Sequence, residues 1–159
     1  MAIHQLIVSV LARARGDRAV AVAARYAGEI LRDRRTGILY DGSAEADVVY
    51  REIMGPVPGT ESAWWRDRET LWNTAEQHEL RNNSRVARDW LVGLPHELTA
   101  EARIELARTW GDFIATRYAV AVDLSVQPNT VALPSFTSHR CAIIGNSHLD
   151  QDTAVRPLP

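Results

Sequence analysis

The sequence contains no lysine, so its positive charge comes from 18 arginine residues, which stand against 20 aspartate and glutamate residues. The resulting net charge of −2 excludes a general binder of polyanions, which would carry a large positive charge. Seven of the arginines nevertheless fall within residues 1–40, where only three acidic residues accompany them. A guanidinium group matches the geometry of phosphate oxygens. We therefore weigh two interpretations of this segment, a solvated basic face and a phosphate-contacting surface.

Cysteine and long apolar runs are also scarce. The single cysteine, Cys141, cannot form a disulfide within the chain and is typical of proteins from a reducing compartment. No apolar run is long enough to cross a membrane, and the first residues do not follow the order of a secretory signal. We expect a cytoplasmic protein with no membrane partner. The short motifs of nucleotide-binding loops, zinc proteases and serine hydrolases are missing as well.

What is present is an alternation of strand-like and helix-like segments in a chain of ordinary domain length. Strands are predicted for residues 4–12, 47–54, 86–94, 119–126 and 141–144. Helices are predicted from a cap at Asp17 to about Arg32, from a cap at Thr60 or Ser62 to about Leu80, and from Thr99 to about Tyr118. The order predicts an α+β fold with a central, mostly antiparallel sheet flanked by helices. The domain would span residues 1–145, followed by an irregular or disordered tail over 146–159.

The first predicted helix places an arginine and a tyrosine side by side, at Arg25 and Tyr26. With 3.6 residues per turn, Arg18, Arg25 and Arg32 lie nearly in line, which predicts a basic stripe on the exposed face. Tyr26 lies about 100° around the helix from that stripe, on the side of the alanines and Ile30. The periodicity therefore predicts that Tyr26 belongs to the edge of the core, with a hydrogen-bonded hydroxyl.

Two side chains near the end of the chain are candidate metal ligands. His139 and Cys141 stand at positions i and i+2, which share one face of a strand. Two ligands do not make a metal site, but Gln127 at the end of the preceding strand could add a carbonyl oxygen. The alternative is a partly buried cysteine beside a surface histidine. The spacing leaves both interpretations open.

Several segments resemble the MobA/MobL family of plasmid relaxases, in the same order and with the same spacing. The strongest are the turn RTG at residues 35–37, ETLWN at residues 69–73 and LPHELT at residues 94–99, and the resemblance covers roughly residues 1–127. The family belongs to the HUH endonuclease superfamily, so the resemblance implies an antiparallel sheet with helices on both sides. It also implies a helix tyrosine that attacks a DNA phosphodiester, and a divalent metal ion, Mg²⁺ or Mn²⁺, held by three histidines.

The residues at that implied site depart from the family pattern. Where the family reads AAYRAG, residues 23–28 of this chain read AARYAG, so Arg25 occupies the nucleophile position and Tyr26 follows it. Gln127 and Cys141 stand in place of two metal histidines, and His139 is retained. A shift of one residue swings the hydroxyl through about 100°. Placement errors of about 1 Å already cost on the order of a hundredfold in rate. The resemblance therefore implies a degenerate active site.

Three functions are compatible with these observations. The first is a relaxase-like DNA-binding domain of a mobile element with impaired nicking, in which Arg18, Arg25 and Arg32 contact phosphates of single-stranded or hairpin DNA. The second is an active, metal-dependent nickase and strand transferase that uses Tyr26. The third is a non-enzymatic scaffold or inhibitor that binds a protein partner of a mobilisation or defence complex. Salt-sensitive DNA binding, a covalent DNA adduct and a stable protein partner would distinguish the three.

Overall fold

The protein is organised around one antiparallel sheet. The computed structural model describes residues 6–44, 47–55 and 64–128, and describes residues 137–146 as backbone. The sheet has the strand order β1-β5-β7-β6-β4, and every neighbouring pair is antiparallel. Its strands are β1 (Leu6–Ala12), β4 (Tyr50–Met54), β5 (Arg85–Pro95), β6 (Ala121–Pro128) and β7 (Thr137–Asn146). This confirms the predicted α+β class, although β7 is longer than the predicted strand at 141–144.

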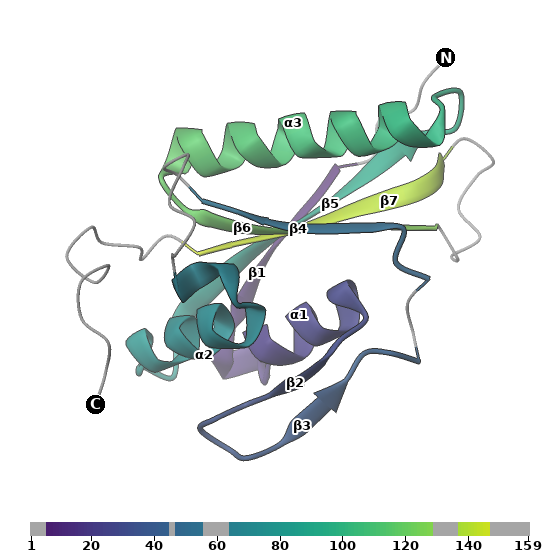
Figure 1. Ribbon diagram of the computed structural model, residues 1–159. Coiled ribbons are helices and arrows are strands. Elements are labelled where there is room, and N and C mark those ends of the chain that lie inside the picture. The colour runs from purple at the N-terminus through teal and green to yellow at the C-terminus, as the bar shows by residue number, and fades with distance from the viewer. Residues whose placement is uncertain (1–5, 45–46, 56–63, 129–136, 147–159) are drawn as a thin grey trace.

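Helices cover both faces of the sheet, as Figure 1 shows. One face carries α3 (Ala100–Tyr118), and the other carries α1 (Ala19–Ala27) and α2 (Arg68–His78). Two clusters of buried residues correspond to these layers, one built around Val20, Leu71 and Trp72 and the other around Ile114 and Leu124. None of the helices in the described ranges combines the length and the apolar character that a membrane span requires.

The first helix ends earlier than the sequence predicted. Gly28 adopts a left-handed conformation with φ of 65° and ends α1, because glycine reaches this conformation without a Cβ clash. The chain then forms a hairpin of β2 (Ile30–Arg32) and β3 (Leu39–Asp41). The prediction of a helix to Arg32 was therefore wrong. The predicted turn at residues 35–37 is present at the tip of this hairpin, where Gly37 has a φ of 74°.

The starts of α1 and α2 also differ from the prediction. Asp17 does not cap α1; instead, the backbone amide of Ala19 donates to Oε1 of Glu76 on α2 over 2.8 Å. A carboxylate from a distant helix thus satisfies an amide that a local cap would otherwise satisfy. Helix α2 follows a single 3₁₀ turn at Trp64–Arg66 and is capped by Asp67, whose carboxylate accepts from the Thr70 amide. The predicted start at residues 60–62 lies outside the described residues. The third helix begins where it was predicted, and Thr99 caps it by accepting from the Ala102 amide.

Candidate functional site

Tyr26 lies inside the protein rather than on its surface. The last turn of α1 directs the ring against the sheet, and only 7% of the residue is exposed. Its hydroxyl donates a hydrogen bond of 2.9 Å to Oδ2 of Asp89, which is buried on β5. The position that periodicity predicted for Tyr26, at the edge of the core with a bonded hydroxyl, is confirmed.

This environment makes the Tyr26 hydroxyl a weak nucleophile. Burial raises the pKa of Tyr26 to about 12, and the charge and hydrogen bond of Asp89 add to the rise, while Arg25 works in the opposite direction. A phenol attacks phosphorus as the phenolate. Moving the pKa from 10 to about 12 lowers the phenolate population near neutral pH about a hundredfold. Burial and the raised pKa therefore both keep the hydroxyl protonated and away from solvent.

Arg25 occupies the exposed position beside the buried tyrosine. Its guanidinium carbon lies 5.3 Å from the centroid of the Tyr26 ring. Arg25 lines a cavity of about 370 Å³ between α1 and β3, together with Tyr40 and Gly42. Gly42 permits this close packing, since a Cβ there would overlap the carbonyl of Ala24. The exposed face of α1 thus presents a cation at the position where the family pattern has its tyrosine.

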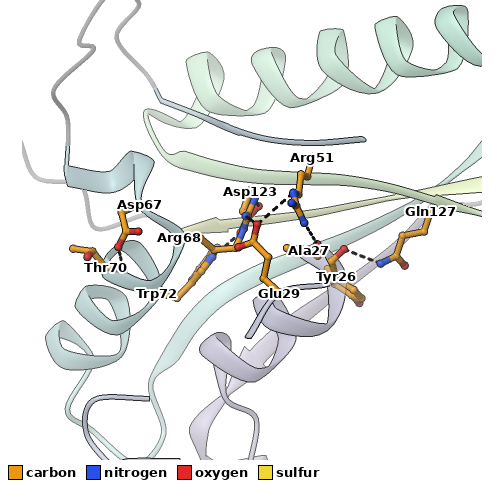
Figure 2. A network of polar contacts seen from close by, with 10 residues as sticks. All are labelled: Tyr26, Ala27, Glu29, Arg51, Asp67, Arg68, Thr70, Trp72, Asp123 and Gln127. Carbon is orange, nitrogen blue, oxygen red and sulfur yellow. Dashed lines mark hydrogen bonds and ion pairs between the residues drawn. The ribbon is translucent and has the colours of Figure 1, made fainter. Parts of the chain in front are cut away.

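Gln127 is bound to the C-terminal end of α1. The residue is 4% exposed, and its side-chain amide nitrogen donates to the carbonyl oxygen of Tyr26 over 2.7 Å and to that of Arg25 over 3.4 Å. Next to it, the guanidinium of Arg51 donates to the carbonyl oxygen of Ala27 over 2.8 Å (Figure 2). The last carbonyls of a helix have no partners within the helix. Gln127 and Arg51 supply those partners from β6 and β4.

The three candidate metal ligands are not brought together by the register of the sheet. Gln127 pairs with Arg140, whereas His139 pairs with Pro128 and Cys141 with Val126. Cross-strand partners share a face and successive residues alternate, so the backbone places His139 and Cys141 at positions of the face opposite to Gln127. The side chains of both residues lie outside the described part of the chain. Gln127 also directs its amide nitrogen to the end of α1. A metal site built from these three residues stays a prediction. Within the described ranges, no group of three or more histidine, cysteine or acidic side chains could hold a metal ion.

A buried ionic network lies beside this region and was missed by the sequence analysis. Arg68 on α2 binds Asp123 on β6 through two hydrogen bonds, of 2.8 and 3.0 Å. Asp123 also accepts from the indole of Trp72 over 2.8 Å, and Arg68 pairs with Glu29 over 2.8 Å (Figure 2). Burial alone would lower the pKa of Arg68, but Asp123 and Glu29 outweigh it and raise that pKa. The available signal was Asp123 itself, the one charged residue of β6, because a buried charge requires a partner.

The three arginines of the predicted stripe lie on three different local structures. Arg18 is the N-cap of α1 and is half-buried, with one guanidinium nitrogen on the Asp17 carbonyl. Arg25 is exposed on the last turn of α1, and Arg32 is exposed on β2 of the hairpin. A single helical stripe is therefore absent, because the helix ends before Arg32. A basic surface that includes all three arginines would extend over both α1 and the hairpin of β2 and β3.

Comparison with known proteins gives consistent matches. The model of the MobA/MobL family matches residues 18–158. The "Mobilization protein MobL" of Acidithiobacillus ferridurans is 35% identical, over 87% of this chain and 36% of that protein. The "Probable mobilization protein MobA" of Bifidobacterium longum is 31% identical, over 77% of this chain and 22% of that protein. The "Probable conjugal transfer protein TraA" of Sinorhizobium fredii is 29% identical over 99% of this chain, yet over only 14% of its own length.

A solved structure shows the same fold. It is described as "Molecular Basis of Vancomycin Resistance Transfer in Staphylococcus aureus", and it superposes with a TM-score of 0.82 at 25% sequence identity. The match covers 98% of this chain and 76% of that one. The curated relatives are much longer, since the chain spans only 14–36% of those compared above. The fold is relaxase-like, the relatives are mobilisation and conjugal-transfer proteins, and the chain belongs to the MobA/MobL family.

Proposed function

We propose that this chain is a relaxase-like DNA-binding domain of a mobile element, that it recognises single-stranded or hairpin DNA, and that its nicking is impaired. The proposal rests on the end of α1, where an arginine and a tyrosine have exchanged places relative to the family pattern. The hydroxyl of Tyr26 is buried on Asp89, and the guanidinium of Arg25 is exposed in its place. A guanidinium binds phosphate oxygens but cannot attack phosphorus.

Binding in this proposal depends on charge at the α1 face and the adjoining hairpin. Arg25 and Arg32 are exposed there, and Arg35 lies at the hairpin tip. Phosphate contacts release counterions, so the affinity for a single strand falls with salt, with a slope of about −0.7 per contact. Because the whole chain has a net charge of −2, attraction for DNA has to come from local basic surfaces such as this face, which favours a specific site over general binding.

The first test is equilibrium binding to single-stranded and hairpin oligonucleotides over a range of salt concentrations. We expect Arg25→Ala to weaken binding and to reduce the salt slope by about 0.7. Arg108→Ala is the matched control, because Arg108 is an exposed arginine on α3, which covers the other face of the sheet. An absence of DNA binding even at low salt would refute the proposal and would favour the protein-binding scaffold.

The second test concerns the chemistry. We expect no covalent DNA adduct on denaturing gels with Mg²⁺ or Mn²⁺, and no effect of EDTA on DNA binding. One observation favours the alternative of an active nickase, because the 2.9 Å bond from Tyr26 to Asp89 resembles the pairing of a nucleophile with its base. That alternative predicts an adduct that Tyr26→Phe abolishes and Arg25→Ala does not. Detection of such an adduct would replace impaired nicking with nicking by Tyr26.

A further inference from the structure

A second cavity lies away from α1 and has no part in the site above. Its volume is about 930 Å³, within the range of roughly 300–1,000 Å³ that small-molecule sites occupy. It lies between the end of α2 with the loop that follows, the start of β5, and the end of α3, from His78 to Val120. It shares no lining residue with the cavity beside Arg25.

The walls of this cavity are basic. Arg81, Arg85 and Arg88 line it and are exposed, and within the described part of the chain none of their three guanidinium groups has an ion-pair or hydrogen-bond partner. Among the described residues that line it, Glu79 is the only acidic one. The C-terminal ends of α2 and α3 add roughly half a negative charge each. Three guanidinium groups still exceed these negative charges, so the cavity attracts anions although the whole chain is slightly acidic.

Two further features of the walls suit a nucleotide better than a simple anion. Tyr118 lines the cavity with 59% of the residue exposed, and Trp90 lines it from β5. Aromatic rings of this kind stack with nucleic-acid bases whatever the sequence. Ser84 also lines the cavity, and its hydroxyl oxygen is buried with no hydrogen-bond partner among the described residues. Its hydroxyl is therefore free to form a hydrogen bond with a polar group of a ligand in this cavity.

We propose that this cavity is a second DNA contact, which holds an unpaired nucleotide of the bound strand. Its phosphates lie against Arg85 and Arg88, and its base stacks on Tyr118. This inference rests on the proposed function, since it assumes that the domain binds DNA. It extends that function, because a strand that reaches both cavities follows the protein from the α1 face to the end where α2 and α3 terminate. The binding footprint is then longer than the α1 site alone requires.

The test uses the whole chain with 5-fluorotryptophan incorporated and fluorine NMR, with the Trp90 resonance assigned through Trp90→Phe. The probes are a ten-residue oligothymidylate, thymidine monophosphate and inorganic phosphate, each titrated at the same ionic strength. We expect the oligonucleotide to shift the Trp90 resonance. We expect Arg85→Gln combined with Arg88→Gln to remove that shift, to weaken binding on the order of tenfold and to reduce the salt slope by about 1.4. Arg108→Gln is the control, and circular dichroism verifies that each variant is folded.

The outcomes separate this site from the α1 site. If the double variant binds DNA as tightly as the wild type while Arg25→Ala does not, the cavity proposal fails and the proposed function stands. If the double variant loses binding while Arg25→Ala has no effect, the cavity proposal stands and the α1 contact fails. An equal Trp90 shift with inorganic phosphate and with the oligonucleotide would identify a simple anion site and overturn the nucleotide proposal. If the wild type binds no DNA, both proposals fail.

Discussion

Replacement of Tyr26 by phenylalanine separates a structural tyrosine from a catalytic one. The ring remains packed against the sheet, and only the hydroxyl is lost from its 2.9 Å bond to Asp89. A hydrogen bond to a charged acceptor contributes about 1.5–3 kcal/mol, and here the buried carboxylate loses a donor. For a domain of this size, 1 kcal/mol corresponds to about 2–4 °C in the melting temperature. Tyr26→Phe should therefore lower the melting temperature by about 3–12 °C.

The contribution of the Tyr26 hydroxyl to the free energy of unfolding also depends on pH. The pKa of Tyr26 is raised from 10 to about 12 in the folded state. The folded state thus holds the phenol proton more tightly than the unfolded state does. The stability that the hydroxyl contributes is fully present below pH 10 and is lost as the pH rises through 12. From pH 10 to pH 12, the difference in the free energy of unfolding between the wild type and Tyr26→Phe should decrease by at most about 2.7 kcal/mol.

Urea denaturation at pH 7 and at several values between 10 and 12 provides the assay, with Tyr118→Phe as the control. Tyr118 is 59% exposed, so loss of its hydroxyl should change the free energy of unfolding by less than about 0.5 kcal/mol. DNA binding at pH 7 should be the same in Tyr26→Phe and in the wild type. A Tyr26→Phe protein as stable as the wild type, or one that differs from it only in its reaction with DNA, would refute the structural role.

Further predictions concern the residues that hold α1, α2 and β6 together. Gln127→Glu places a carboxylate against the carbonyl oxygen of Tyr26 and removes the donor of the 2.7 Å bond, so the free energy of unfolding should fall by at least about 1–3 kcal/mol in urea denaturation. Arg68→Leu leaves the Asp123 carboxylate buried without its cation and should cost about 3–5 kcal/mol, whereas Arg68→Leu combined with Asp123→Leu should recover much of the loss in a double-mutant cycle. Asp67→Ala removes the cap of α2 and should cost about 1 kcal/mol, measured as a lower melting temperature.

Local patterns predicted much of the fold correctly. Alternating and apolar runs predicted β5 and β6 within two residues of their bounds, and Thr99 predicted the start of α3. These signals are local, because the side-chain period of a strand or helix and a capping hydroxyl act within a few residues. The prediction of a helix to Arg32 was wrong because it also used only local signals. The periodicity continued past Gly28, but the pairing of β2 with β3 depends on residues about ten positions away.

In the candidate site, too, local signals predicted some features, and contacts between distant residues decided the others. Helical geometry alone separated Arg25 from Tyr26 and assigned the tyrosine to the core, and the departures from the family pattern were visible in the letters of the sequence. The partners of these residues were not visible. Asp89 lies 63 residues from Tyr26, and Gln127 lies 101 residues from the carbonyl that it binds. The register of β6 with β7, on which the grouping of Gln127, His139 and Cys141 depends, is likewise a property of the assembled sheet.

The sequence by itself thus determined the fold class, the family and the position of an arginine where the family has its nucleophile. Periodicity and motif spacing are carried by neighbouring residues, so they can be read from the chain before it folds. Only the tertiary structure decided that the Tyr26 hydroxyl is buried on a carboxylate, that Gln127 holds the end of a helix, and that three exposed arginines line a second cavity. The physical reason is that burial, pKa and ligand geometry depend on which distant segments meet, and those contacts form only when the sheet and its helices assemble.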